Sequence, residues 1–205
     1  FGIRETDCRK TSAEKYDMNS TIQKNFQENL EIAQMLPSFE KEVEQIAQEI
    51  ITCLKNGHKL IFLGNGGSAA DAIHMAEEYV GISSKTRIRR GLPAIALTEN
   101  ISTITAIAND WDYHYIFWRQ LKAIAEPGDL VICFTTSGES KNVVYAVKYC
   151  KKQGIKTISF TGSQKNTVAD LSDIVFRAHS RRESRIQETY MFVNHILCEL
   201  VDEAF

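Results

Sequence analysis

Residues 59–81, KLIFLGNGGSAADAIHMAEEYVG, combine a loop that could bind an anion with side chains that could transfer protons. A short apolar run ends at Leu63 and is followed by GNGGS, whose glycines permit a tight loop and whose Ser68 is placed to cap a helix. Backbone N–H groups of such a loop and of a helix N-terminus converge on one anion. His74 and Glu78 lie four residues apart and therefore share a helix face just beyond this site. The pattern predicts either a phosphate loop beside reactive groups or an ordinary turn and helix.

A second candidate loop follows the apolar run LVICF and reads TTSGES. Its hydroxyl groups surround Gly138 just before a helical pattern, and they could bind the peripheral oxygens of one phosphate. The hydroxyl residues are Thr135, Thr136, Ser137 and Ser140. The alternative for this loop alone is a serine-rich turn that caps a helix. Ligands of parallel sheets bind at the carboxyl ends of the strands, so two such loops at adjacent strand ends favour phosphate.

The elements that must position these loops follow from the hydrophobic periodicity. It predicts a helix over 20–35, broken at Leu36-Pro37-Ser38, and a second helix with an apolar stripe from Phe39 to Leu54 that ends at Asn56-Gly57. Beyond Lys59, β-branched runs alternate with helical patterns, which indicates a mostly parallel sheet with helices on both faces. The strands expected after 59–63 are 94–97, 130–134, 157–160 and 174–176, and the later helices are 102–108, 113–124, 140–153, one near Val168, and 183–202.

Length and composition fit one α/β domain. The chain has 205 residues, 43% of them hydrophobic, and we expect a single domain over 20–205 that includes an N-terminal helical hairpin, with 1–19 as a tail. A formal charge of −2 argues against a general surface for nucleic acid or membrane. The five cysteines are dispersed and lack a C-x-x-C pair, and the sequence contains no apolar run of transmembrane length and no secretory signal core. We therefore expect a reduced cytoplasmic protein.

Four motifs resemble, in order and spacing, those of the phosphoheptose isomerases, which are members of the sugar isomerase (SIS) domain superfamily. They are GNGGSAADAIHMAEE, NDWDY, TTSGESKNV and RIQETYMFVNHIL. The resemblance runs from the second predicted helix to the C-terminus. The hydroxyl loop is shared across the superfamily, whereas an H-x-x-x-E helix combined with a late Q-x7-H helix is much more specific.

The resemblance implies a flavodoxin-like three-layer sandwich with a mostly parallel five-stranded sheet. It also implies a homotetramer with active sites at subunit interfaces, and we expect the apolar stripes of both N-terminal helices to be buried against other subunits. Implied phosphate contacts are Thr135, Thr136, Ser137 and Ser140, and the other implied substrate contacts are Asn65, Gly66, Gly67, Ser68, Glu78, Asn109, Asp110 and Gln187. The ligands of one zinc per subunit match His74, Glu78, Gln187 and His195, with Glu78 and His195 also as the catalytic acid/base pair.

The implied activity converts sedoheptulose 7-phosphate to D-glycero-D-manno-heptose 7-phosphate through an enediol, the first step of heptose nucleotide biosynthesis for lipopolysaccharide or capsule. A carboxylate such as Glu78 can take the carbon-bound proton, and an imidazole such as His195 can relay protons between the two oxygens. The metal would either stabilise the reacting oxygens as a Lewis acid or have a structural role. The oxygen donors among its ligands also suit iron, manganese or nickel. Gln187 and His195 lie about 12 Å apart along a helix axis, so they bracket one metal or serve sites in different subunits.

Two positions depart from the family pattern. Ile82 stands where many members have a substrate-binding arginine, and the cluster of Arg87, Arg89 and Arg90 either replaces that arginine or forms a solvated loop. Ser184 stands where some members have an aspartate. Both departures bear on sugar specificity.

Two other classes of function are alternatives to an isomerase. One is a non-catalytic SIS protein that binds a replication initiator, and the other is a sugar-phosphate sensor. The initiator-binding relative lacks the terminal histidine, whereas this chain retains His195 beside His74 and Glu78. A sensor needs the phosphate loops but no acid/base pair, so retention of the pair favours the isomerase. The remaining histidines, His58, His114 and His179, are interpreted as structural.

Overall fold

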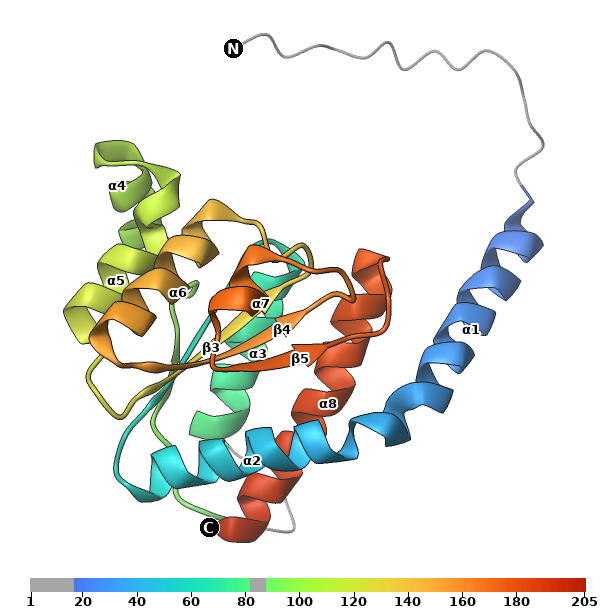
Figure 1. Cartoon of the computed structure of the whole chain (residues 1–205), viewed down its shortest axis with the longest axis horizontal. Coiled ribbons are helices and arrows are strands. Elements are labelled where there is room, and N and C mark those ends of the chain that lie inside the picture. The colour runs from blue at the N-terminus through green and yellow to red at the C-terminus, as the bar shows by residue number, and fades with distance from the viewer. Residues whose placement is uncertain (1–16, 82–87) are drawn as a thin grey trace, which may run out of the picture.

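Five parallel strands form one sheet at the centre of the molecule (Figure 1). In chain order they are β1 (Leu60–Gly64), β2 (Ala94–Ala96), β3 (Leu130–Thr135), β4 (Lys156–Thr161) and β5 (Ile174–Arg177). The computed structural model describes residues 17–81 and 88–205, so the predicted tail as far as residue 16, Ile82 and Arg87 lie outside the described residues. Each predicted strand is confirmed to within one residue at either end, and every pairing is parallel.

The strand order β2-β1-β3-β4-β5 explains where a ligand can bind. The chain adds β2 on one side of β1 and then returns to place β3 on the other side, where Gly64 of β1 is in register with Phe134 of β3. In such sheets the connections from the two central strands leave in opposite directions, and a crevice opens at their carboxyl ends. The glycine loop and the hydroxyl loop both start at this crevice.

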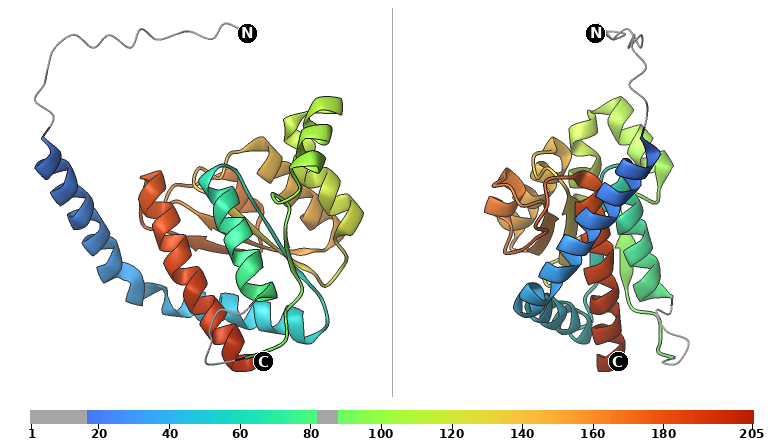
Figure 2. Two further views of the ribbon diagram at one scale, coloured as in Figure 1. Left: turned by 180° about the vertical axis from the view of Figure 1, so that it is seen from behind. Right: turned by 90° about the vertical axis from the view of Figure 1, so that its right-hand side faces the viewer.

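Helices cover both faces of the sheet (Figures 1 and 2). The helices of the described residues are α1 (Met18–Met35), α2 (Glu40–Lys55), α3 (Gly67–Val80), α4 (Ile101–Asp110), α5 (Ile116–Ile124), α6 (Lys141–Gln153), α7 (Thr167–Leu171) and α8 (Glu183–Ala204), with 3-10 turns η1 (Leu36–Phe39) and η2 (Tyr113–Tyr115). None of these helices is long and apolar enough to cross a membrane.

Alternate side chains of the central strands separate two apolar clusters. Leu60 and Phe62 of β1 pack with α2, α3 and α8, whereas Ile61 and Leu63 pack with α5, α6 and α7. This alternation is the period of two that a strand imposes on its side chains. Because both faces are covered, β1 and β3 are buried along their whole length, as expected of a parallel sheet. The three-layer α/β architecture that the sequence predicted is therefore confirmed.

The two N-terminal helices differ from expectation. The apolar stripe of α2 is buried within its own chain, next to α8 and the sheet, so the expectation that other subunits bury it is wrong. Phe39 anchors the turn between the helices, because its ring packs 4.8 Å from that of Phe176. Pro37 begins this turn, and α1 and α2 meet there at a wide bend rather than folding back as a hairpin (Figures 1 and 2).

Among the helices of the described residues, α1 leaves an apolar stripe uncovered along its length. It has no buried residue, and it exposes large side chains at intervals of four along one face. These side chains are Met18, Ile22, Phe26 and Leu30. The helix projects along the side of the molecule next to α8 (Figure 2).

Candidate functional site

The glycine loop connects β1 to α3 in a way that tolerates few other residues. Gly66 has a φ of 58°, and a Cβ on Gly64 would lie 2.4 Å from the carbonyl oxygen of Ser68. Gly66 occupies the N-cap position without a side-chain cap, and Ser68 is buried inside the first turn. The expectation that Ser68 caps the helix is therefore wrong. The N-terminus of α3 is left open to a ligand, which suits an anion better than a capped terminus does.

Two side-chain amides, the buried Asn142 and the half-buried Asn65, hold this loop in place. Asn65 Nδ2 donates to Asn142 Oδ1 (2.9 Å), and Asn142 Nδ2 donates to Asn65 Oδ1 (2.8 Å). The Tyr113 hydroxyl also donates to Asn65 Oδ1 (3.0 Å). Asn142 lies in the motif TTSGESKNV and Tyr113 in NDWDY, but neither was predicted as a site residue. Asn65 thus ties the glycine loop to the start of α6 and to η2.

In the hydroxyl loop, one serine side chain makes no hydrogen bond to the helix that follows the loop. Thr135 Oγ1 accepts from the Gly138 N–H (3.1 Å), and Ser137 Oγ accepts from the Glu139 N–H (3.3 Å), so these hydroxyls shape the loop. Ser140 is the N-cap of α6 but makes no side-chain cap bond. Its hydroxyl is therefore available to a ligand at the positive end of the helix.

A cavity of about 280 Å³ opens beside the hydroxyl loop. Thr136 and Ser137 line it together with residues that follow β4 and β5, including Ser163 and Arg181. The carboxylates of Glu139 and Glu183 also line the cavity, and Glu139 accepts hydrogen bonds from Thr167. The hydroxyls and the guanidinium are the groups of this lining that can bind a phosphate. Arg181 was not predicted as a site residue, because its position far from the hydroxyl loop in sequence gives no local signal.

His74, Glu78 and His195 come together on the face that α3 and α8 share. Glu78 Oε1 lies 3.3 Å from His74 Nε2 and 3.9 Å from His195 Nε2, and the two imidazole rings are 5.3 Å apart. Their ligand atoms all lie within 4.8 Å of one another. The carboxylate is largely shielded, whereas about half of the His195 side chain is exposed. Two imidazoles and a carboxylate facing solvent can bind a divalent metal, move protons, or do both.

Gln187 lies at the other end of the same helix pair. A Cβ on Gly67 would lie 2.4 Å from Gln187 Nε2, so the amide of Gln187 occupies the space that this glycine leaves open. Helices α3 and α8 therefore run side by side in the same direction, with Gln187 beside the start of α3 and His195 two turns further along (Figure 2). Within one chain, Gln187 is closer to the glycine loop than to the imidazoles.

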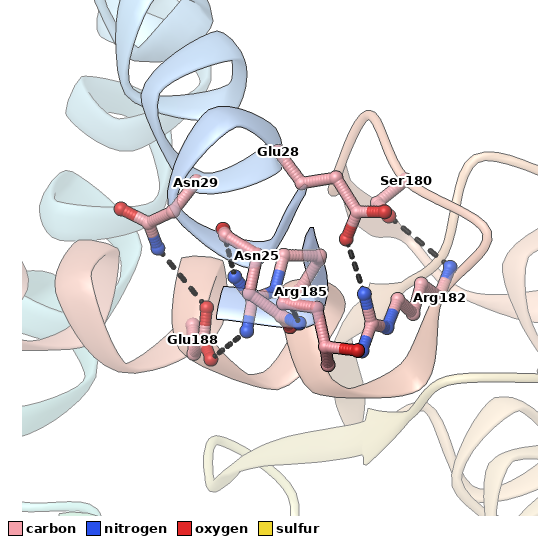
Figure 3. Close-up of polar contacts among 8 residues, drawn as sticks. Asn25, Glu28, Asn29, Ser180, Arg182, Arg185 and Glu188 are labelled. Atoms are coloured by element: carbon pink, nitrogen blue, oxygen red, sulfur yellow. Dashed lines mark hydrogen bonds and ion pairs between the residues drawn. The ribbon is translucent and has the colours of Figure 1, made fainter. Parts of the chain in front are cut away.

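Polar side chains fasten α1 to the first turns of α8 (Figure 3). The buried Arg185 donates to a carbonyl oxygen of α1 (3.0 Å) and pairs with Glu188 (2.6 Å). The contacts between α1 and this part of α8 are Glu28–Arg182, Asn29–Glu188 and Asn25–Arg185. They flank Gln187 on both sides in sequence. Helix α1 therefore helps to fix the segment that carries it.

Asp71 is a further acid near the imidazoles, one turn before His74. Burial raises the pKa of its carboxyl to about 6, and His74 opposes this rise. Its Oδ2 atom is buried with no hydrogen-bond partner in the part of the chain that is described. At neutral pH the ionised carboxylate adds negative potential beneath the site, which favours a bound cation. Asp71 lies within the GNGGSAADAIH motif but was not predicted as a site residue.

Asn109 and Asp110, which the resemblance implies as substrate contacts, are not brought to the other site residues. Both are exposed at the end of α4, where Asn109 Nδ2 donates to Asp110 Oδ1 (2.8 Å). Within the described ranges no hydrogen bond joins either residue to the glycine loop or to the imidazoles. Their part in substrate binding stays a prediction.

Arg89 has a structural role rather than a role as a free cation. Its side chain is 3% exposed and pairs with Asp202 near the end of α8 (Nε to Oδ1, 2.5 Å). It also donates to the carbonyl oxygens of Glu78 and Tyr79 at the C-terminal end of α3 (3.0 and 2.9 Å). These contacts leave it unable to replace the arginine missing at Ile82, and of the basic cluster only Arg90 is exposed among the described residues.

Comparison with known proteins decides the family. The family model described as SIS domain matches residues 26–162. A phosphoheptose isomerase from Thermodesulfovibrio yellowstonii is 41% identical over 191 residues, which cover 91% of this chain and 92% of the relative. A phosphoheptose isomerase from Aquifex aeolicus is 42% identical over 187 residues, which cover 91% and 97%. The chain belongs to the phosphoheptose isomerases of the SIS domain family.

The fold agrees with this family. The solved structure of a phosphoheptose isomerase from Neisseria gonorrhoeae matches with a TM-score of 0.85 at 31% identity, covering 91% of this chain and the whole of that chain. The predicted phosphoheptose isomerase fold is therefore confirmed. Membership of the phosphoheptose isomerases also makes the chain an enzyme. The roles of His74, Glu78 and His195 in its chemistry stay predictions.

Arg89 should contribute to stability rather than to substrate binding. Replacing Arg89 with Gln should lower the free energy of unfolding by about 3–5 kcal/mol, because one partner of a buried ion pair is removed. Enzyme that remains folded should keep its KM for substrate. Urea denaturation and steady-state kinetics measure the two effects. The exposed neighbour serves as the control, since Arg90→Gln should leave stability unchanged. A normal stability with a raised KM for Arg89→Gln would instead assign the arginine to substrate.

Proposed function

We propose that this chain catalyses the aldose–ketose isomerisation of sedoheptulose 7-phosphate to D-glycero-D-manno-heptose 7-phosphate. The observation that carries the proposal is the Glu78 carboxylate between two imidazoles, at 3.3 and 3.9 Å, on a face that also carries the glycine loop. A binding protein or sensor would not need a carboxylate and an imidazole within proton-transfer range. Neither alternative is favoured.

The loops at the crevice would hold the phosphate end of the sugar. The free hydroxyl of Ser140, the exposed Ser137 and the half-buried Thr136 surround the N-terminus of α6. Thr135 is buried and would act mainly by shaping the loop, since it accepts from Gly138. Arg181 in the adjoining cavity would add a guanidinium. Asn65, Gly66, Gly67 and Ser68 would orient the sugar chain next to this phosphate.

The proton transfers assign separate roles to the acid/base pair. Glu78 takes the proton from C1 of the ketose, and the electron pair forms the C1–C2 double bond of the enediol while O2 receives a proton from His195. Glu78 then returns a proton to C2, and the hydroxyl on C1 gives its proton back to His195. The sum moves one hydrogen from C1 to C2 and another from O1 to O2, and it leaves both side chains as they began.

The donor set fits a divalent metal. His74, Glu78 and His195 would hold it, with the buried carboxylate of Asp71 adding negative potential. Gln187, which lies against Gly67 within one chain, would be a fourth donor to this metal or to a site shared with another subunit. Two imidazole nitrogens and a carboxylate oxygen suit zinc, which would supply Lewis-acid stabilisation of negative charge on the sugar oxygens. The chain's own contribution is to place Glu78 so that one carboxylate oxygen faces the imidazoles and the other remains for the substrate.

The assembly that we propose is a homotetramer with interfacial sites. The stripe on α1, together with the exposed Ile73, Val80 and Phe192 on the face of α3 and α8, forms apolar surface that another subunit would cover. We place the enzyme in the cytoplasm, since its four described cysteines are buried and unpaired. There its product, a phosphorylated aldose, would supply heptose nucleotide synthesis for lipopolysaccharide or capsule.

Replacing Glu78 with Gln tests the proposed function directly. The amide has nearly the same volume, so the variant should stay folded and bind sugar phosphate, but it should lose turnover by at least the roughly 10²-fold typical of removing a general base. Wild-type enzyme should also incorporate solvent deuterium at C1 or C2, and the variant should not. His195→Gln should lose turnover as well.

The adjacent carboxylate provides the matched control for this test. Glu77 is exposed and lies about 100° round α3 from Glu78, so Glu77→Gln should isomerise and exchange like wild type. If Glu78→Gln also behaves like wild type, the base lies elsewhere. If the wild-type chain neither isomerises nor exchanges sedoheptulose 7-phosphate, the proposed substrate is wrong.

Removing the two serine hydroxyls tests the phosphate loop. Ser137→Ala combined with Ser140→Ala should raise KM about tenfold or more, because two hydrogen bonds to a charged group are lost. The change in kcat should be smaller, since these bonds are made in ground state and transition state alike. Steady-state kinetics on the sugar phosphate measures both constants. Ser102→Ala on α4 is the control. An unchanged KM in the double variant would mean that this loop does not bind the phosphate.

Charge placed on the stripe of α1 tests the assembly. Phe26→Glu should shift the protein from a tetramer to smaller species at micromolar concentration, because a buried charge has no partner in an apolar interface. Light scattering measures the molar mass. Lys24→Glu, on the opposite face of α1, should leave the tetramer intact. A wild-type protein that is monomeric at this concentration would contradict the proposed assembly.

A further inference from the structure

A groove of about 500 Å³ lies between α5 and α6, on the side of the sheet opposite α3 and α8 (Figure 1). None of its lining residues belongs to the glycine loop, the hydroxyl loop or the imidazole cluster. Its volume is within the range of pockets that hold small organic ligands. The reaction described above gives it no role.

Aromatic rings form one wall of this groove. Trp118 of α5 lies 6.4 Å from Tyr149 of α6, and Tyr115 of η2 stacks 5.6 Å from Tyr145. Trp118 also lies 5.7 Å from Tyr115 in an edge-on contact, so the rings form a panel of touching rings whose planes are tilted rather than coplanar. All of these side chains are partly exposed rather than part of the core. Partly exposed aromatic faces of this kind are suited to stacking against a flat ligand.

Lysines form the rim of the groove, with no acidic side chain among the lining residues. Lys122, Lys148 and Lys152 line it and are exposed, and the Lys122 ammonium lies 5.5 Å from the centre of the Trp118 ring. The sequences of α5 (IFWRQLKAI) and α6 (KNVVYAVKYCKKQ) contain no Asp or Glu, although the whole chain carries a formal charge of −2. The positive charge is thus segregated onto the two helices that form the groove.

We propose that this groove binds a nucleoside phosphate. The base would stack on the panel of Trp118 and Tyr145, and the phosphates would pair with Lys148 and Lys152. A flat aromatic group joined to a compact anion can contact the aromatic rings and the lysines at the same time. A sugar phosphate has no planar ring to stack on the aromatic panel, and inorganic phosphate has only the charge. This binding does not rest on the proposed isomerase function.

The groove also has a physical connection to the glycine loop. The 3-10 turn η2 carries Tyr115, which stacks on Tyr145 in the groove, and Tyr113, which donates to Asn65 in the loop. Asn142, the other partner of Asn65, precedes Tyr145 by one turn of α6. A ligand in the groove therefore contacts the two elements that hold the glycine loop.

Fluorescence anisotropy with N-methylanthraniloyl-labelled ADP on the purified full chain tests the proposal. The probe should bind saturably and be displaced by unlabelled ADP. Adenosine and pyrophosphate should compete far more weakly, because adenosine can contact only the aromatic rings and pyrophosphate only the lysines. Lys148→Gln combined with Lys152→Gln should weaken binding about tenfold or more, since two charge pairs are lost. These lysine side chains are exposed, so the double variant should keep the thermal stability of wild type. Trp118→Leu should weaken binding as well.

Matched controls separate the groove from other anion sites. Lys151→Gln removes one positive charge from α6 outside the groove and should leave binding unchanged, whereas Lys148→Gln alone removes the same charge inside the groove and should weaken binding. Excess sedoheptulose 7-phosphate should not displace the probe. Equal loss in Lys151→Gln, unchanged binding in the double lysine variant, or displacement by the sugar phosphate would overturn the proposal. Tighter binding of longer single-stranded oligonucleotides would overturn it too, because the groove would then serve nucleic acid.

Discussion

The candidate chemistry depends on the packing of two helices, α3 and α8, that are far apart in the chain but lie side by side and run in the same direction. Met75 and Tyr79 of α3 share an apolar cluster with Val193 and Leu197 of α8. Burying each such side chain contributes about 1.5–3 kcal/mol, which is ample to fix one register. A slip by a single turn would move His195 by about 5.4 Å, more than its present separation from Glu78. The apolar register thus sets the distances at the site.

A second, polar constraint acts at the crevice between β1 and β3. The reciprocal amide bonds of Asn65 and Asn142 join the glycine loop to the helix that carries the hydroxyl loop. Buried amides that are fully paired are specific in geometry, because an unpaired amide in the same place would cost about 1–3 kcal/mol. The two loops are therefore positioned relative to each other before any ligand arrives. Arg89 acts similarly at the opposite end of α3, where it joins that helix to Asp202.

The parts of the structure that depend on local periodicity were predictable from the sequence. The strands and most helices follow directly from runs and stripes, and the spacing of His74 and Glu78 on one helix placed them on one face. The side chains that depend on long-range packing were not predictable in this way. Arg89 lies in a basic run that could equally have faced solvent. Arg181 lines the cavity beside the hydroxyl loop because the segment after β5 is hydrogen-bonded to the segment after β4, through Ser180 and Ser163.

The N-terminal helices illustrate the same limit. Their stripes look alike in sequence, yet α2 is buried in its own core and α1 is not. Periodicity reveals that a face is apolar but not which surface covers it. The motif NDWDY raises a related difficulty, since Asn109 and Asp110 remain at the end of α4 while Tyr113 reaches the glycine loop. A motif locates a functional region more reliably than it assigns the individual contacts.

The attachment of α1 by polar contacts alone separates folding from assembly. Because α1 adds no buried apolar side chain to the described chain, the core can reach its native packing without it. Hydration competes well for the ion pairs that hold α1 to α8, so this helix is free to dock late. In the proposed homotetramer, dilution would therefore release subunits whose cores remain folded, and the concentration of the protein, rather than its temperature, would decide how much of the assembly is present.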